Sequence, residues 1–108
     1  MPQVYIINDK HRNGTPTGSQ WTIAEAEEID SFLLAEREGW LGLAVGWGLH
    51  VVQSRPSYLG IAVDRIRNLF VAKFVASEPP IRWHGYPADP EKRVQDIPEE
   101  AILDAWLQ

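Results

Sequence analysis

Large and small side chains alternate with a period of two from Leu41 to Val51. Leucine, valine or tryptophan occupies each odd position, and glycine, alanine or His50 occupies each even position. Since successive side chains of a β-strand point to opposite faces of a sheet, this pattern predicts one long strand. Its bulky face would enter a core, and its small face would let a helix approach the backbone. A hairpin that turns at residues 46–48 is the alternative interpretation.

The pattern changes to a helical period before this strand. Thr22 and Glu25 have the spacing of a capping box, in which Thr22 is the N-cap and Glu25 reaches back to it. The predicted helix runs to about Glu38 and ends at Gly39, because glycine commonly caps helices in the left-handed conformation. Apolar side chains at helical spacing form the expected buried face: Ile23, Ala26, Ile29, Phe32 and Leu33.

Three further segments are rich in strand-forming residues. Residues 4–7 predict a short first strand, and residues 58–63 and 69–76 predict two strands joined as a hairpin. A helix over residues 61–76 is the alternative, because the apolar residues of this stretch also fit helical spacing. The polar loop at residues 8–20 is long for a compact domain, and we expect it to be mobile rather than functional.

A second helix is predicted near the end of the chain. Pro98 is favoured at the start of a helix, where its missing N–H costs nothing. The apolar stripe of this helix consists of Ile102, Leu103, Trp106 and Leu107. The element order β-α-β-β-β-α predicts one α+β domain over residues 1–108. We expect a mostly antiparallel sheet with both helices packed on one face.

Composition and charge narrow the range of functions. The 108 residues include 15 acidic and 10 basic ones, and the net charge of −5 disfavours broad nucleic-acid binding. The absence of cysteine excludes a disulfide scaffold, a thiolate zinc site and a cysteine nucleophile. The uncharged stretch at residues 39–54 is shorter than the roughly 18 apolar residues of a membrane span, and no signal peptide is visible. We therefore expect a cytoplasmic protein without membrane contact.

Residues 79–90 contain four prolines together with two aromatic residues, a histidine and an arginine. Proline lowers the entropy cost of a fixed loop, and aromatic residues are frequent in recognition surfaces. We predict a rigid contact loop that acts together with the acidic side of the first helix, which favours a basic protein partner. The candidate binding residues are Arg82, Trp83, His84, Tyr86 and Asp89 in the loop and Glu27 and Asp30 in the helix.

The block from Trp83 to Asp89, with the sequence Trp-His-Gly-Tyr-Pro-Ala-Asp, is followed by Asp96-Ile97-Pro98 and by the helix with Leu103 and Trp106. This arrangement resembles a block in small uncharacterised bacterial and phage proteins, over about a quarter of the chain. The resemblance implies a prokaryotic or mobile-element origin. It brings no activity and no catalytic residue with it.

Catalytic chemistry would depend on the three histidines, His11, His50 and His84. None of them has metal-ligand spacing, so we expect no metal and no other cofactor. His84 and His50 would act as acid and base, with Asp89 as the orienting carboxylate, if the fold brings them together. The alternative is that His50 is a half-buried, hydrogen-bonded residue and that His84 shapes a loop. No serine lies in a nucleophile-elbow pattern, and no phosphate-binding loop is present.

Three hypotheses of function follow from these features. The first is a small protein-binding module, an inhibitor, immunity or anti-defence protein, for which a homo-oligomer stays open. The second is a small hydrolase or ribonuclease that uses His84 and His50. The third is a nucleic-acid-binding module whose basic patch would consist of Arg65, Arg67, Lys73 and Arg82. We favour the first, because the sequence shows neither a catalytic set nor a dense basic surface.

Overall fold

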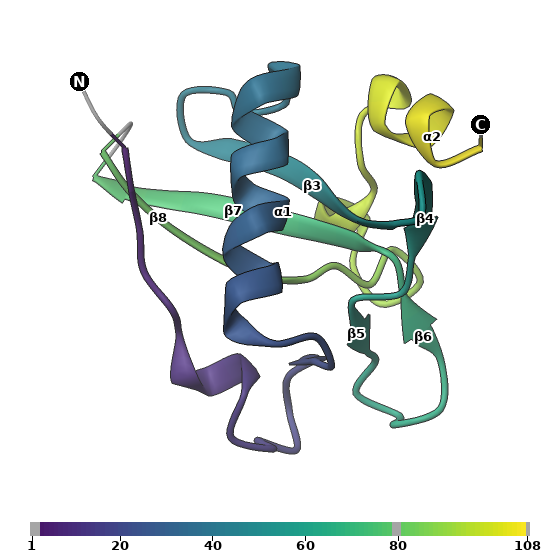
Figure 1. The fold of residues 1–108 in the computed structure, drawn as a ribbon. Coiled ribbons are helices and arrows are strands. Elements are labelled where there is room, and N and C mark those ends of the chain that lie inside the picture. The colour runs from purple at the N-terminus through teal and green to yellow at the C-terminus, as the bar shows by residue number, and fades with distance from the viewer. Residues whose placement is uncertain (1–2, 79–80, 108) are drawn as a thin grey trace.

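The computed structural model describes residues 3–78 and 81–107 of the chain. Its central sheet has five strands: β1 (Val4–Tyr5), β3 (Val45–Val52), β4 (Arg55–Ser57), β7 (Val71–Glu78) and β8 (Arg82–Pro87). They lie in the order β1-β8-β7-β3-β4, and the three long strands are visible at the centre of Figure 1. All neighbours are antiparallel except β1 and β8, which run parallel.

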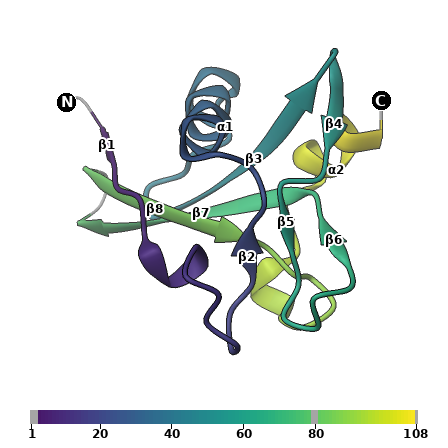
Figure 2. The same cartoon turned by 60° about the horizontal axis from the view of Figure 1, so that its bottom comes forward.

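A second, smaller sheet and two short 3-10 helices complete the connections. They are β2 (Gln20–Trp21), β5 (Gly60–Ile61), β6 (Asn68–Leu69), η1 (Asp9–His11) and η2 (Val94–Asp96). Figure 2 shows the three short strands side by side at the end of β8. The approach is close, because a Cβ added to Gly60 would lie 2.3 Å from Pro87 Cγ. The small sheet therefore holds the polar loop at residues 8–20 against the C-terminal end of β8.

Helix α1 (Glu25–Glu38) lies across one face of the central sheet (Figure 1). It begins after Ala24, so the predicted N-cap at Thr22 is wrong. Thr22 is kept extended because its N–H donates to Leu59 O at 3.0 Å, alongside the small sheet. The predicted end is confirmed, because Gly39 caps the helix with a left-handed φ of 76°.

The buried face of α1 is shifted from the predicted one. Phe32 packs into the core as predicted, whereas Ile29 and Leu33 are exposed. Glu28 points inward in their place, since its carboxylate is paired with Arg12. The buried helix residues are Glu28, Ser31, Phe32 and Ala35.

The predicted central strand is confirmed from Val45 on as β3, but its predicted start at Leu41 is wrong, and so is the alternative hairpin at residues 46–48. A Cβ added to Gly48 would lie 2.8 Å from Ser31 O in α1, so the small face of the strand admits the helix as expected. The strand begins at Val45 because the preceding residues form a tight turn. In that turn the Gly42 N–H donates to Val45 O at 2.8 Å.

The predicted hairpin is confirmed over a short part, because β5 and β6 pair antiparallel in the small sheet with Gly60 opposite Leu69. The rest of the second segment is β7, which starts at Val71 and pairs with β3 in the central sheet. The alternative helix over residues 61–76 is therefore wrong.

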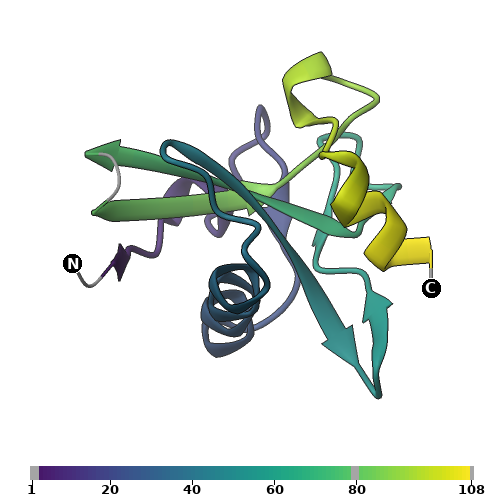
Figure 3. The same ribbon diagram turned by 90° about the horizontal axis from the view of Figure 1, so that it is seen from above.

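The two helices lie on opposite faces of the central sheet, as Figure 3 shows. Phe74 in β7 packs against Phe32 of α1, with ring centroids 5.2 Å apart. Trp47 lies in register with Lys73, the neighbour of Phe74 in β7, so it points to the other face of the sheet. There it shares a cluster with Ile102 of α2 (Glu100–Leu107). The predicted α+β class and mostly antiparallel sheet are confirmed, but the placement of both helices on one face is wrong.

Half of the segment that was expected to be a rigid loop is strand β8. Its burial alternates, so that Trp83, Gly85 and Pro87 are buried while His84 and Tyr86 are half-buried on the other face. Strand alternation therefore divides the predicted contact residues between two faces of the sheet. Parts of the sequence predictions lie outside the described residues: Pro79, Pro80 and the side chains of Trp106 and Leu107.

Candidate functional site

A polar pocket of about 210 Å³ opens on the face of the sheet opposite α1. Its floor includes His84 and Tyr86, which lie in register beside Val75 and Lys73 of the neighbouring strand β7. The walls come from the loop at residues 8–20 and from the connection between β8 and α2. Two segments that are far apart in the sequence, residues 8–19 and 84–96, therefore build most of the site, and Val63 completes its lining.

His11 closes one side of this pocket. Its ring stacks on Tyr86, with centroids 5.2 Å apart and an interplanar angle of 20°. Its Nδ1 lies 2.9 Å from Ser19 O, and since a carbonyl oxygen only accepts, Nδ1 carries a proton. Burial lowers the pKa of His11, the hydrogen bond to Ser19 opposes this in part, and the charges of Lys10 and Arg93 lower the pKa further. At neutral pH the imidazole is therefore neutral and Nε2 bears the lone pair.

Asp96 joins the pocket to the sheet beneath it. Tyr86 donates its hydroxyl proton to Asp96 Oδ1 at 2.8 Å, and the Asp89 N–H donates to Asp96 Oδ2 at 3.0 Å. Lys73 Nζ lies 3.7 Å from Oδ1 of the same carboxylate. Burial raises the pKa of Tyr86 and the hydrogen bond to Asp96 raises it further, so the phenol stays protonated. Asp96 thus fixes the loop after β8 onto the strands.

Asp89 is the second carboxylate of the pocket, and it faces Arg67. The guanidinium makes a two-fold contact, from Nη1 to Oδ1 at 3.0 Å and from Nη2 to Oδ2 at 2.7 Å. These hydrogen bonds lower the pKa of Asp89. Arg67 also pairs with Asp64 and Glu91 and so joins two loops. Both carboxylates of the pocket are therefore occupied by the protein's own donors.

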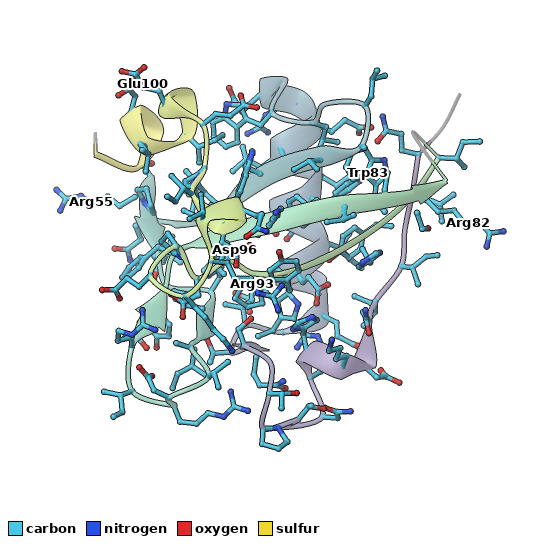
Figure 4. All side chains as sticks on the ribbon, turned by 180° about the vertical axis from the view of Figure 1, so that it is seen from behind. Arg55, Arg82, Trp83, Arg93, Asp96 and Glu100 are labelled. Carbon is cyan, nitrogen blue, oxygen red and sulfur yellow. The ribbon has the colours of Figure 1, made fainter. Side chains whose placement is uncertain are left out.

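The cations around the pocket are not neutralised in the same way. Three of them have no carboxylate partner among the described residues: Lys10, Lys92 and Arg93. Figure 4 shows Arg93 and Asp96 in the middle of this face, whereas Arg55 and Arg82 project from opposite sides of the molecule. The pocket therefore presents an excess of positive charge on a chain whose net charge is −5.

The loop at residues 8–20, which was expected to be mobile, is attached to the body of the protein at several points. Arg12 Nη2 lies 2.7 Å from Glu28 Oε1, and Nη1 donates to a main-chain oxygen. Arg65 donates from Nη2 to Thr15 O at 2.7 Å. These contacts give the loop a defined position beside the pocket.

The structure brings together some of the predicted binding residues and not others. His84, Tyr86 and Asp89 all line the pocket. Trp83 has 0 % exposed surface and packs beneath α1, so it cannot contact a partner. Arg82 is exposed at the far end of β8, away from the pocket.

The remaining predicted residues lie on the other face of the sheet. Glu27 and Asp30 belong to α1, so they form no continuous surface with the pocket. His50 is half-buried on that same side, with Nε2 3.6 Å from Glu27 Oε2. The predicted catalytic pair of His50 and His84 is therefore wrong, because the sheet separates the two imidazoles. The imidazole that shares a pocket with His84 is His11.

The basic patch that was expected for a nucleic-acid-binding module does not form. Lys73 is buried and donates from Nζ to Gln95 O at 2.7 Å. Arg67 is held by carboxylates, Arg65 donates to main-chain oxygens, and Arg82 is remote.

Sequence reasoning missed the two loop segments that supply the cations Lys10, Lys92 and Arg93. It named His11 as one of the three histidines but did not place it beside His84. Nothing in the local pattern shows that the two connections meet over β8. The one available signal was the unusual length of the loop at residues 8–20, since long loops in compact domains are often functional.

Within the described part of the chain, no group of three or more histidine, cysteine, aspartate or glutamate residues could hold a metal ion. No helix there is long and apolar enough to cross a membrane. Comparison with known protein families, characterised proteins and solved structures finds no match. Fold and site together define an α+β protein with a basic pocket on one face of its sheet.

Proposed function

We propose that the protein binds a phosphate-bearing ligand in the basic pocket. The observation that carries this proposal is the convergence of Lys10, Lys92 and Arg93 on one pocket, without carboxylate partners among the described residues. Phosphate oxygens accept charge-assisted hydrogen bonds from lysine and arginine, and arginine matches them with two parallel donors. The imidazole of His84, which has no hydrogen bond within the described part of the chain, adds a further donor when it is protonated.

The distribution of charge favours a ligand with one phosphate in the pocket over a long duplex. Lys10, Lys92 and Arg93 gather at one pocket of about 210 Å³, whereas the chain as a whole carries −5. A rigid polyanion that lies across the surface would be repelled by the acidic residues outside the pocket. This repulsion acts over a Debye length of about 10 Å. A small phosphate ester, or a flexible strand that inserts one phosphate, avoids this repulsion.

Calorimetric titration with inorganic phosphate and with a nucleoside monophosphate, at low and at physiological ionic strength, tests the proposal. We expect Arg93→Ala and Lys92→Ala each to weaken binding about 10-fold, the loss of one charge-assisted hydrogen bond. Arg55→Ala is the matched control, because Arg55 is an exposed cation remote from the pocket (Figure 4). Absence of binding, or equal affinities in all three variants, would overturn the proposal.

A second candidate function is protein binding at a hollow between α1 and β3. Three exposed aliphatic side chains line it: Leu33, Val51 and Val52. Glu27, Asp30 and Arg37 line the same hollow. An apolar patch beside carboxylates fits a basic protein partner. An inhibitor or immunity protein of prokaryotic origin, the role predicted from the sequence, would use this surface in place of Trp83.

Affinity capture with a matched pair of variants tests the second candidate. Leu33→Glu places a charge in the centre of the patch, and Ile66→Glu places one on an exposed isoleucine in the turn between β5 and β6. We expect a stoichiometric protein partner to be retained by the wild type and by Ile66→Glu, and to be lost with Leu33→Glu. Equal retention by both variants would remove this surface from consideration.

A further inference from the structure

The pocket holds two imidazoles that differ in their hydrogen bonds. His11 has its Nδ1 proton committed to Ser19 O at 2.9 Å, and its ring plane is fixed by stacking on Tyr86. Its Nε2 is therefore an acceptor, as a general base requires. The imidazole of His84 has no hydrogen bond among the described residues, so both of its nitrogens are open to a ligand.

Among the described residues that line the pocket, no hydroxyl or thiol is hydrogen-bonded to either imidazole. The chain contains no cysteine, and the Ser19 hydroxyl donates to Pro87 O at 2.7 Å. The Tyr86 hydroxyl donates to Asp96. Thr17 is exposed at the rim and has no hydrogen bond with either imidazole within the described residues. A base without a protein nucleophile suits a substrate that carries its own attacking hydroxyl.

We propose that this pocket cleaves single-stranded RNA by transesterification, with His11 as the general base and protonated His84 as the general acid. The inference rests on the phosphate-binding function proposed above. His11 Nε2 takes the proton of a ribose 2′-hydroxyl, the 2′-oxygen forms a bond to the adjacent phosphorus, and the bond from phosphorus to the 5′-oxygen breaks. The leaving 5′-oxygen takes a proton from His84. The products are a 2′,3′-cyclic phosphate and a 5′-hydroxyl, and proton exchange with water restores both imidazoles.

The unpaired cations have a matching role in this reaction. Negative charge builds up on the non-bridging phosphate oxygens as the 2′-oxygen attacks, and cations placed beside those oxygens stabilise it. Lys92 and Arg93 line the same pocket as both imidazoles. Neither residue forms an ion pair with a carboxylate among the described residues, so both can contact the phosphate oxygens of the transition state.

The in-line geometry of the reaction and the charge of the chain both favour single-stranded over duplex RNA. In-line attack by the 2′-oxygen requires the phosphodiester to leave the helical conformation, and a flexible strand does this at low cost. The acidic remainder of the chain also disfavours an extended polyanionic ligand. One phosphodiester inserted into the pocket satisfies both conditions.

The test is incubation of a labelled single-stranded ribo-oligonucleotide with the full chain in EDTA, with the DNA of the same sequence in parallel. We expect cleavage of the RNA alone, with 2′,3′-cyclic phosphate ends detected by mass spectrometry. His11→Asn and His84→Asn should each lower the rate at least 10²-fold, the usual size of general acid–base effects. His50→Gln is the control, since His50 lies on the other face of the sheet and should leave the rate unchanged.

The outcomes separate this inference from the function on which it rests. Intact RNA with normal phosphate binding overturns the cleavage alone, whereas intact RNA without phosphate binding overturns both. Equal cleavage of DNA, or wild-type rates in His11→Asn and His84→Asn, also overturns it. The wild type should show a bell-shaped pH profile for one base and one acid, and this readout does not depend on the folding of any variant.

Discussion

Arg12 and Glu28 form an ion pair inside the protein, with Arg12 Nη2 2.7 Å from Glu28 Oε1 and Nε at 2.9 Å from the same oxygen. The carboxylate has 0 % exposed surface, and its other oxygen accepts a hydrogen bond from the Tyr5 hydroxyl. Burial raises the pKa of Glu28, and the contacts with Tyr5 and Arg12 oppose that effect. The pair attaches the loop that carries His11 to helix α1.

Replacement of Glu28 by glutamine is expected to destabilise the fold by about 3 kcal/mol, because Arg12 is left without its anion. This value is at the lower end of the destabilisation expected when a buried ion pair is broken, because the Arg12 side chain keeps some contact with solvent. The loop should also loosen, so phosphate affinity should fall although Glu28 does not line the pocket. Urea unfolding and calorimetric titration measure the two effects.

Glu25→Gln is the matched control, because Glu25 is exposed on the same helix and forms no ion pair among the described residues. It should change stability by less than about 0.5 kcal/mol. Equal losses in Glu25→Gln and Glu28→Gln would show that helix charge, and not the buried pair, accounts for the effect.

Trp83→Ala is expected to destabilise the fold by about 3–5 kcal/mol, because it removes a fully buried ring that packs against Phe32. A Trp83 side chain in an exposed contact loop, as predicted from the sequence, would instead affect binding. Tyr58→Ala is the control, since Tyr58 is an exposed aromatic residue. A Trp83→Ala variant with wild-type stability in thermal unfolding would contradict the burial of this ring.

The parts of the fold that follow from local periodicity could be predicted. The alternation in β3 and the helical spacing before Gly39 identify a strand and a helix, because each pattern reports the burial of neighbouring residues. The face on which α2 packs could not be predicted. Its apolar stripe shows that one side is buried but carries no information on which side of the sheet receives it.

The candidate site depends on contacts that local patterns do not encode. The prediction took His84 and Tyr86 as part of a loop, although their alternation with buried Trp83 and Gly85 is that of a strand. The four prolines at residues 79–90 favoured the loop interpretation. His11 reaches the same pocket only because a buried ion pair beside it, rather than an apolar stripe, positions its loop.

Gly85→Ala is expected to destabilise the fold by about 1–3 kcal/mol, the usual cost of overpacking a core. A Cβ at this position would lie 2.5 Å from Phe74 Cδ1, and Phe74 is fully buried and has no room to move. Gly18→Ala is the matched control, because the added Cβ would meet only His11 at an ordinary 3.6 Å. Thermal unfolding should show a lower midpoint for Gly85→Ala alone, and similar midpoints in both variants would argue against this packing.

Stability should fall on acidification below about pH 4, the range in which unfolded aspartates bind protons. Hydrogen bonds from the N–H groups of Arg67 and Ile66, and from the Arg67 guanidinium, lower the pKa of Asp64 to about 2. Arg67 also lowers the pKa of Asp89. The stabilisation is present above the unfolded pKa and is lost as the pH falls through the folded values.

Arg67→Lys keeps the charge but loses the paired donors, so it should flatten this acid dependence. Urea unfolding at a series of pH values from 2 to 5 measures the slope for both proteins. A slope that is unchanged in the variant would show that Arg67 does not control these carboxylates.

A second pH effect should arise from His11. Burial lowers the pKa of this residue below the value of about 6.5 in the unfolded chain, so the unfolded state binds more protons between the two values. The free energy of unfolding therefore rises with pH across that window and falls as the pH drops below about 6.5. His11→Asn should remove this slope, whereas His50→Gln should retain it, in urea unfolding at pH values from 5 to 7. If His11→Asn keeps the wild-type slope, His11 is solvated rather than enclosed between Ser19 and Tyr86, and its assignment as a neutral base loses its basis.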